Sequence, residues 1–443
     1  MLDIKKIKEN PDAVKAGLRA KEVDCDATVD RILELDGKIR TLKTNTETQT
    51  AQKNKLAKEN GKLFGMKKKA EKEGKDVSEL DAAIAANNAQ SVQIAEAIEQ
   101  ELAELKTLSD EYRVAMLSLP NLPDPDLKPG GKENNEPLRY FGEPHKFDFT
   151  PKHHVDLCEG LGLIDYDRGV KLAGSGFWMY KGMGARLEWA LLNYFIDCHI
   201  ADGYEFILPP HMLEYQCGET AGQFPKFADE VYKIANPTDD RVHYMLPTAE
   251  AALCSIYRDE ILTEAELPRK FFAYTPCFRR EAGSYGKDVR GLNRLHEFSK
   301  VELVRIDKPE HSEQSHQEML AHVEGLLQKL ELPYRILRLC GGDMSFTSSI
   351  CYDFEVYSEA QKRWLEVSSV SNFDTYQANR LKCRYRRTED KKTELCHTLN
   401  GSALALPRIV AAIMENNQTP EGIRVPKCLV PYCGFEMLDD QPC

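Results

Sequence analysis

The sequence lacks three features that would each point to a particular class of protein. No stretch approaches the roughly 18 consecutive apolar residues that a membrane-spanning helix needs. No Cys-x-x-Cys pair occurs among the 13 cysteines, and their irregular spacing argues against a disulfide framework or a zinc site. Residues 1–20 mix acidic and basic side chains without an apolar run, which argues against a secretory signal or a transit peptide. We therefore expect a soluble, cytoplasmic protein with reduced thiols and no membrane partner.

An excess of positive charge is also missing, because the formal net charge is −12. This balance argues against indiscriminate binding to nucleic acid, although a local basic surface could still hold an RNA. The chain has 443 residues, of which 42% are hydrophobic. At about 100–200 residues per domain, it is long enough for several domains with a sizeable core.

Two helical stripes occupy the first part of the chain, after a short helix expected to begin near Pro11. Apolar residues recur at spacings of three and four in a first set, Val29, Ile32, Leu35, Ile39 and Leu42, and in a second set, Leu80, Ile84, Ile94, Ile98, Leu102, Leu105, Leu108 and Tyr112. The polar stretch between them contains Gly61, Gly65 and Gly74, so the helices are predicted to pack as an antiparallel coiled-coil hairpin. At ~1.5 Å per residue, about forty residues per helix give an arm on the order of 60 Å.

The charge reverses near the predicted tip of this hairpin. Nine lysines against three glutamates lie in residues 51–75, which leaves a local formal charge of +6. Lysine runs on coiled coils most often form a solvated surface, and an RNA-binding surface is the alternative. Composition alone does not decide between them.

A proline-rich segment separates the hairpin from the rest of the chain. Residues 118–137 contain five prolines together with Gly130 and Gly131, which is typical of a linker. Beyond it, short strand-like runs alternate with occasional helices. We therefore predict an α+β protein with a helical-hairpin domain at 1–117, a linker at 118–137 and an antiparallel-sheet domain at 138–443.

An arginine and a carboxylate lie where two strand-like runs meet a loop. Residues 279–281 read Arg-Arg-Glu, and the chain resumes as a strand at 296–304, with Phe298, Lys300 and Glu302 alternately on one face. A guanidinium fork suits bidentate contact with a phosphate, and a nearby carboxylate can orient it or accept from an adenine amine. An isolated Arg-x-Glu, however, is most often a surface ion pair.

The surrounding segment 278–302 resembles the second signature motif of class II aminoacyl-tRNA synthetases, and in detail that of seryl-tRNA synthetases. Three further segments resemble elements of this family in the same order: Thr248-Ala249-Glu250, the strand Glu366 to Asn372, and the third motif from Asn400 to Arg408. Each has another explanation when taken alone, since Thr-x-Glu can cap a helix and a serine-rich run can be an exposed strand. Four segments in order make chance a poor explanation.

The resemblance implies an enzyme that activates L-serine with ATP, releases pyrophosphate and transfers serine to the 3′-terminal adenosine of serine tRNA, with selenocysteine tRNA as an optional further substrate. The ATP-binding residues would be Arg279, Arg280, Glu281, Leu295, Phe298, Glu366, Val367, Ser368, Ser369 and Arg408. The serine-binding residues would be Thr248, Ala249, Glu250, Arg279, Glu302, Asn400 and Ser402. Glu366 and Ser369 would hold Mg²⁺, which prefers oxygen ligands, and Arg279 and Arg408 would be the catalytic groups.

These roles agree with the chemistry of adenylation. The serine carboxylate attacks the α-phosphate in line, so positioning and charge neutralisation supply most of the catalysis and no covalent enzyme intermediate is expected. A serine pocket must satisfy a hydroxyl, and buried polar partners reject analogues without it by about 10⁴- to 10⁵-fold. Glu302 and Ser402 are candidates for the hydroxyl, and Thr248 and Glu250 for the ammonium group.

Two other regions also fit the family. Residues 185–195 are predicted to form an amphipathic helix, followed by a strand at 204–208 and Pro209-Pro210, and they resemble the first class II motif. In the family this motif builds a homodimer interface; the alternative is an internal core helix, and periodicity does not separate the two. The family's arm reaches the long variable arm of serine tRNA, so these side chains would contact the RNA backbone: Lys53, Lys55, Lys67, Lys68 and Lys69.

The third motif departs from the family pattern at two positions. Ala403 stands where glycine is common, and Pro407 directly precedes Arg408, so both crowd the approach to ATP. Proline is tolerated in the first turn of a helix, which would let the arginine project correctly.

Three rival interpretations remain from the sequence. A silent homologue that only binds RNA would be free to lose residues that are intact here, namely Arg279, Glu281, Glu302, Glu366 and Arg408. An enzyme that charges a carrier protein would not need the lysine-tipped arm. A purely structural coiled-coil protein explains only the first third of the chain.

Overall fold

The computed structural model describes residues 1–281, 291–293 and 295–439, which form two compact units. One unit contains Ile7–Pro11 and Cys25–Leu119, and the other contains Met1–Lys6, Asp12–Asp24 and the described residues from Pro120 onward. The units therefore do not follow the predicted domain at 1–117 throughout. The reason is local packing: Lys21 Nζ donates to the backbone oxygens of Ser345 and Ser348 at 2.8 and 2.9 Å.

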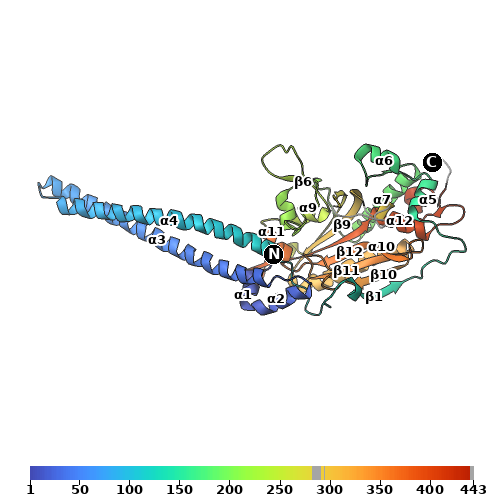
Figure 1. Cartoon of the computed structure of the whole chain (residues 1–443), viewed down its shortest axis with the longest axis horizontal. Helices are drawn as coiled ribbons and strands as arrows, with labels where there is room; N and C mark the ends of the chain where they lie inside the picture. Colours follow the sequence, from blue (N-terminus) through green and yellow to red (C-terminus); the bar gives the residue numbers. More distant parts are fainter. Residues whose placement is uncertain (282–290, 294, 440–443) are drawn as a thin grey trace. The chain divides into compact units, whose positions relative to one another are not determined.

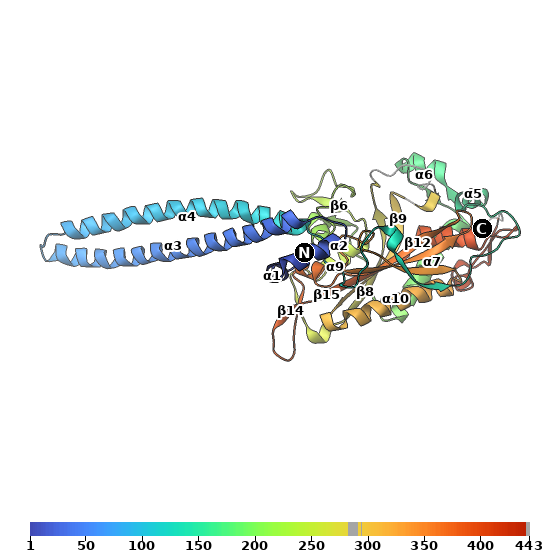
Figure 2. The same cartoon turned by 60° about the horizontal axis from the view of Figure 1, so that its bottom comes forward.

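The helical hairpin consists of α3 (Asp26–Lys72) and α4 (Ser78–Ser118), which run side by side in Figures 1 and 2. Helix α3 continues through Gly61 and Gly65, so the turn is confined to residues 73–77 and is shorter than the polar stretch predicted from the sequence. Each mid-helix glycine costs about 1 kcal/mol relative to alanine, which packing against α4 offsets. The buried residues of the two helices are Val29, Ile32, Leu35, Ile39, Leu56, Asn60, Ile84, Met116 and Leu117.

One polar contact interrupts the apolar seam of the hairpin. Asn60 Nδ2 donates to Asn88 Oδ1 at 2.8 Å, and Asn87 Nδ2 donates to Asn60 Oδ1 at 3.0 Å. A buried amide that finds its partners in only one alignment specifies the register of two helices. The cluster therefore fixes how α3 and α4 pair near the tip.

An eight-stranded sheet forms the centre of the other unit, in the order β1-β10-β11-β12-β15-β9-β8-β4. Its strands are β1 (Glu136–Phe141), β4 (Glu205–Phe206), β8 (Arg269–Phe278), β9 (Glu297–Asp307), β10 (Tyr334–Arg338), β11 (Ile350–Ser358), β12 (Arg363–Asn372) and β15 (His397–Ala405). All neighbouring pairs are antiparallel except β4 with β8. The predicted antiparallel sheet is confirmed, and Figure 1 labels most of its strands.

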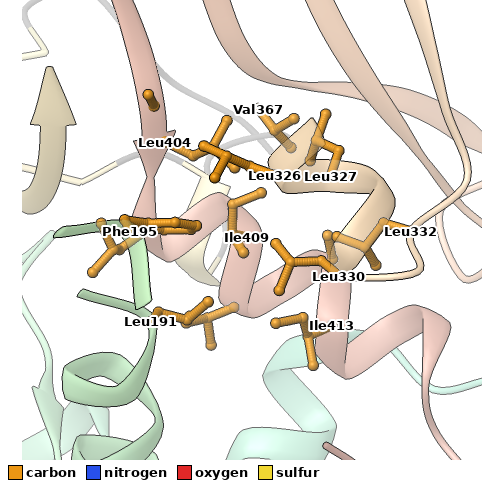
Figure 3. Packing of buried hydrophobic residues seen from close by; sticks show 14 of the residues in the cluster. Leu191, Phe195, Leu326, Leu327, Leu330, Leu332, Val367, Leu404, Ile409 and Ile413 are labelled. Carbon is orange, nitrogen blue, oxygen red and sulfur yellow. The ribbon is translucent and has the colours of Figure 1, made fainter. Parts of the chain in front are cut away.

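Helices cover both faces of this sheet. On one face, α7 (Met183–Ala201), α10 (Ser312–Lys329) and α12 (Leu406–Asn416) enclose the main core, where Figure 3 shows Leu191, Phe195, Leu326, Leu327, Val367, Ile409 and Ile413. On the other face, α9 (Ala249–Ser255) and α11 (Tyr376–Leu381) pack against Phe271, Ala273 and Val304. Ala273 lies opposite Glu302, so this second face carries the predicted site.

Shorter elements complete the two units. These are α1 (Ile4–Glu9), α2 (Pro11–Ala20), α5 (His154–Gly160), α6 (Tyr166–Ala173), α8 (Tyr215–Thr220), α13 (Val430–Cys433), the 3₁₀ turns η1 (Lys132–Asn134), η2 (Glu264–Glu266), η4 (Gly291–Asn293) and η5 (Pro309–His311), and the strands β2 (Ile164–Asp165), β3 (Met179–Tyr180), β5 (Met212–Glu214), β6 (His243–Met245), β7 (Ile261–Thr263), β13 (Arg384–Arg386), β14 (Thr393–Leu395), β16 (Ile423–Arg424) and β17 (Met437–Leu438). Among the described residues, no helix combines the length and apolarity needed to cross a membrane. All twelve described cysteines are free thiols.

The predicted linker is held against the sheet domain. Asn121 is buried, and its Nδ2 donates to the backbone oxygens of Thr347 and Phe373, both at 2.9 Å. Strand β1 already begins at Glu136, inside the predicted linker at 118–137. The proline-rich segment is therefore packed against the sheet domain and is not a free linker.

Candidate active site

A cavity of about 510 Å³ opens on the sheet face described above. It is bordered by parts of β9, β11, β12, β15, α12 and η4, and by residues that follow β8. Nine of the predicted site residues line it: Arg279, Glu281, Leu295, Phe298, Glu366, Val367, Ser368, Ser402 and Arg408. Segments that are far apart in the sequence are thus brought together around one cavity.

Arg279 and Phe298 form one side of the cavity. Arg279 directly follows β8, and its guanidinium carbon lies 5.2 Å from the centre of the Phe298 ring. Phe298, Lys300 and Glu302 lie opposite alternate residues of β8, so their predicted placement on one face is confirmed. A guanidinium beside a half-buried aromatic ring provides one group for a phosphate and one for a nucleobase.

A β-bulge in β12 brings Glu366 and Ser369 to the same face of the sheet. Ser369 lies opposite Asp353 and Glu366 lies opposite Glu355, with a register shift between the two pairs. Asp353 and Glu355 are two residues apart on β11 and share a face. In a regular strand, two residues three apart would point to opposite faces. The extra residue is Val367, which points into the core in Figure 3.

The face around the bulge carries oxygen donors that repel one another when ionised. Arg408 Nη1 donates to the backbone oxygen of Glu366 at 2.7 Å and lies 3.2 Å from its carboxylate. Burial and then the charge of Glu366 hold the pKa of Asp353 well above its ordinary value. Ser369 Oγ lies 3.0 Å from Cys351 Sγ. A hard divalent cation such as Mg²⁺ fits this oxygen-rich surface, because it would neutralise the gathered carboxylates.

A buried polar cluster adjoins the cavity. Lys300 Nζ donates to Thr248 Oγ1 at 2.8 Å and lies 2.5 Å from Glu302 Oε2. Ser402 Oγ donates to Glu302 Oε2 at 3.4 Å, and Thr248 caps α9 by accepting from the backbone nitrogen of Glu250 at 3.3 Å. The four predicted residues Thr248, Glu250, Glu302 and Ser402 therefore lie together. Lys300 belongs to the same cluster and received no role from the sequence, although its place in the alternating strand pattern was a usable signal.

The pKa of the Glu250 carboxyl group is higher than that of an ordinary glutamate. Burial and then the nearby charge of Glu302 raise its pKa to about 7, against the opposing effects of Lys300 and of hydrogen bonds from Gln377 and Gln223. Gln377 Nε2 donates to Glu250 Oε1 at 2.6 Å, and Gln223 Nε2 donates to Oε2 at 3.4 Å. Sequence reasoning missed both glutamines, because a lone amide carries no recognisable spacing. The carboxyl group is poised to receive a cation near neutral pH.

Some predicted residues do not line the cavity. Arg280 Nη1 donates to the backbone oxygen of Asp229 at 2.9 Å. Ala249 is fully buried in the first turn of α9, and Asn400 lies opposite Ser371 within the sheet. Their assignments, like that of Ser369, stay predictions.

The two departures in the third motif do not displace its arginine. Ala403 is fully buried in the main core, and Pro407 lies in the first turn of α12, where it needs no intrahelical hydrogen bond. Arg408 follows directly and reaches the cavity. Residues 282–290 and Arg294 of the second motif lie outside the described residues.

The lysines of the arm differ in their surroundings. Lys53, Lys55, Lys68 and Lys69 are exposed on α3. Lys67 is half-buried, because its Nζ lies 2.5 Å from Asp81 Oδ1 on α4 and 3.8 Å from the carboxylate of Glu71. Contact with RNA remains a prediction for all five, and Lys67 is the one already neutralised within the hairpin.

Two family models match the chain. The seryl-tRNA synthetase N-terminal domain matches residues 1–123, and the class II tRNA synthetase core domain for G, H, P, S and T matches residues 232–417. Serine–tRNA ligase 2 of Clostridium acetobutylicum is 45% identical over 441 residues, covering 99% of this chain and 100% of that protein. Serine–tRNA ligase of Salinibacter ruber is also 45% identical, covering 99% of each chain.

Two solved structures agree with these relatives. The crystal structure of seryl-tRNA synthetase from Pyrococcus horikoshii complexed with ATP superposes with a TM-score of 0.87 at 34% identity over 100% of both chains. The cytoplasmic serine–tRNA ligase of Naegleria fowleri in complex with AMP gives a TM-score of 0.84 at 26% identity over 99% of both chains. The family models, the full-length relatives and the superposed structures agree with one another, and the chain belongs to the seryl-tRNA synthetase family.

Proposed function

We propose that this chain is a serine–tRNA ligase, which activates L-serine with ATP to seryl-adenylate, releases pyrophosphate and transfers serine to the 3′-terminal adenosine of serine tRNA. The observation that carries the proposal is the position of the Lys300–Glu302–Ser402 cluster next to the cavity that holds Arg279 and Phe298. A small polar pocket for an amino acid thus adjoins a surface suited to a nucleotide. The names of the full-length relatives and the ATP-bound structural neighbour support the same reaction.

In this proposal, each part of ATP has a side chain of the cavity as its partner. Phe298 offers its face to the adenine, Arg279 grips the α-phosphate and Arg408 neutralises the γ-phosphate. Glu366 and Ser369 would hold Mg²⁺, which would supply further positive charge for the departing pyrophosphate. Because the side chains only position and neutralise, the serine carboxylate attacks the α-phosphate directly.

In this proposal, the buried cluster binds the ammonium group and the hydroxyl of serine. The ionised Glu250 carboxylate and Thr248 receive the ammonium group, and Glu302 with Ser402 satisfies the hydroxyl. Lys300 balances the charges of Glu302 and Glu250 while the pocket is empty. Alanine would leave the buried Glu302–Ser402 pair without a partner, which is the physical basis for its rejection.

Transfer to tRNA uses the arm. The exposed Lys53, Lys55, Lys68 and Lys69 provide cationic contacts for the RNA backbone, with Lys67 as a weaker contributor because of its pair with Asp81. Such contacts read the shape of the RNA and not its base sequence. Selenocysteine tRNA is an optional further substrate in this proposal.

The chain acts as a homodimer in this proposal. Large apolar side chains are exposed on α7 and around β4: Trp189 at 58%, Phe206 at 36%, Leu208 at 71% and Met212 at 47%. Helix α7 buries its other side in the core, so these residues form a surface that a second copy would cover. The free thiols, among them Cys383 and Cys396 with sulfur atoms 4.0 Å apart, support a reducing compartment, for which we propose the cytoplasm.

Serine-dependent exchange of labelled pyrophosphate into ATP tests the activation step. We expect exchange with serine and not with threonine, alanine or glycine, and a loss of about 10²- to 10³-fold in Arg279→Ala, since removing one donor to developing charge costs that much. No exchange with any amino acid would overturn the proposal and favour a homologue that only binds RNA.

A further inference from the structure

A buried histidine behind the cavity has no part in the reaction described above. His154, the first residue of α5, is 0% exposed, and its ring nitrogen Nδ1 lies 2.7 Å from Glu415 Oε1. The backbone nitrogen of His154 donates to the same oxygen at 3.1 Å. Glu415 is on α12, seven residues after Arg408, and therefore two turns further along the same side of that helix.

The other ring nitrogen of His154 holds the backbone of η4. The Leu292 backbone N–H donates to His154 Nε2 at 3.0 Å. Gly291 has a φ of +73°, and a Cβ there would lie 2.5 Å from His154 Nε2 and 2.3 Å from Val155 Cγ2. The turn therefore packs directly against the histidine ring, and Leu292 itself lines the cavity.

These contacts define one tautomer. Because a backbone N–H donates to Nε2, that nitrogen is unprotonated, so the proton is on Nδ1 and is donated to Glu415. The carboxylate of Glu415 also accepts from the hydroxyl of Ser358, the last residue of β11, and at 3.0 Å from Gln361 Nε2 in the β11–β12 connection. Every polar atom of the histidine ring has a defined partner.

A metal site is the competing explanation for this cluster. His153, His154 and Glu415 have one ligand atom each within 4.8 Å of one another. However, both ring nitrogens of His154 are used, and His153 Nδ1 accepts from the backbone nitrogen of Val155 at 3.2 Å. A cation held by His153 Nε2, His154 Nδ1 and Glu415 would have to displace the proton that His154 donates to Glu415, and His153 Nε2 lies 4.0 Å from that carboxylate, so the observed contacts favour a hydrogen-bond relay.

We infer that His154 is a positioning residue for ATP, which ties the helix that carries Arg408 to the turn that carries Leu292. Two walls of the nucleotide cavity come from separate segments of the chain, and the ring fixes their separation through one hydrogen bond to each. The inference rests on the proposed function, since it concerns the ATP side of the same site. Serine binding should be affected much less, because its cluster lies on β9, β15 and α9.

Two substitutions of His154 test the two hydrogen bonds of its ring separately, one with Glu415 and one with Leu292. Asparagine places its amide near the position of Nδ1 and keeps a donor to Glu415, whereas glutamine reaches the position of Nε2 and can present an oxygen to Leu292 N–H. We expect His154→Asn to raise KM for ATP in the exchange reaction by about five- to tenfold, the effect of one lost buried hydrogen bond, with kcat and KM for serine changed less than about twofold. His154→Gln should restore much of the ATP KM, because its backbone nitrogen still donates to Glu415 while its side chain accepts from the Leu292 N–H. The matched control His153→Asn should behave like the wild type.

Gly291→Ala provides a second test that leaves the relay's side chains intact. Its Cβ would push the turn from the ring, so KM for ATP should rise as in His154→Asn, while thermal unfolding reports whether each variant folds. The inference is wrong if the Asn and Gln variants have the same ATP KM, if KM for serine and ATP rise together, or if Gly291→Ala folds with an unchanged ATP KM. Absence of exchange in the wild type would instead reject the proposed function.

Discussion

The raised pKa of Glu250 gives the proposed serine site a pH dependence that can be measured. The carboxyl group is surrounded by Glu302 and Lys300 from β9 and by the amides of Gln377 and Gln223. Burial and the charge of Glu302 raise its pKa to about 7, so the group is protonated below this value and ionised above it. Since only the carboxylate attracts an ammonium group strongly, kcat/KM for serine should fall as the pH decreases through about 7.

The size of the effect follows from the ionised fraction. With a pKa of about 7, roughly one tenth of Glu250 is ionised at pH 6 and nine tenths at pH 8, so kcat/KM for serine should change about tenfold over this interval. Glu250→Gln removes the ionisable group. It should lower kcat/KM at pH 8 by roughly 10- to 150-fold, because a hydrogen bond to a charged group contributes about 1.5–3 kcal/mol.

The assay is serine-dependent pyrophosphate exchange at low serine concentration from pH 5.5 to 8.5, with ATP saturating. Glu250→Gln should have a flat profile below pH 8, and Glu302→Gln should move the acidic limb to lower pH, because it removes a negative charge beside Glu250. The reasoning is refuted if the wild-type profile is flat between pH 6 and 8, or if Glu250→Gln keeps the same acidic limb.

Two further outcomes concern the arm and the assembly. Lys68→Glu combined with Lys69→Glu should reduce aminoacylation of serine tRNA at least about tenfold at low salt, while pyrophosphate exchange stays within about twofold. The reason is that these exposed lysines lie on α3, outside the unit that holds the cavity. Equal loss in both assays would contradict their assignment to tRNA binding. Trp189→Asp should shift the protein from dimer to monomer in light scattering, with Leu172→Asp on α6, whose side chain is more exposed than that of Trp189, as control. A monomeric wild type would contradict the proposed interface.

The parts of the fold that could be predicted from the sequence are those with a local signal. The stripes of α3 and α4 follow helical spacing, and the alternation of Phe298, Lys300 and Glu302 gives the face of β9. The ends of elements were harder, since Gly61 and Gly65 looked like parts of a turn and are helical only because α4 packs beside them. Asn121 shows the same limit, because its partners lie more than 200 residues away.

The site residues also fall into two groups, those with a local signal in the sequence and those without one. Arg279, Glu302 and Ser402 came from motifs, and the structure places them around one cavity and its adjoining cluster. Gln377 could not be identified, because it acts on Glu250 across a distance of 127 residues in the sequence. His154 escaped notice for a similar reason: its contact with Leu292 depends on the packing of α5 against a turn and on no spacing within either segment.

The bulge in β12 has a consequence for comparing related chains. Glu366 and Ser369 share a face only because Val367 is an extra residue in the strand. Removing one residue between them would place them two apart, a spacing at which a regular strand turns both side chains to the same face, so the bulge would be lost while the pair stayed on this face. A relative with one residue fewer between them can therefore still present both groups to one cation, whereas a relative with the same spacing and no bulge would turn one of them to the opposite face of the sheet.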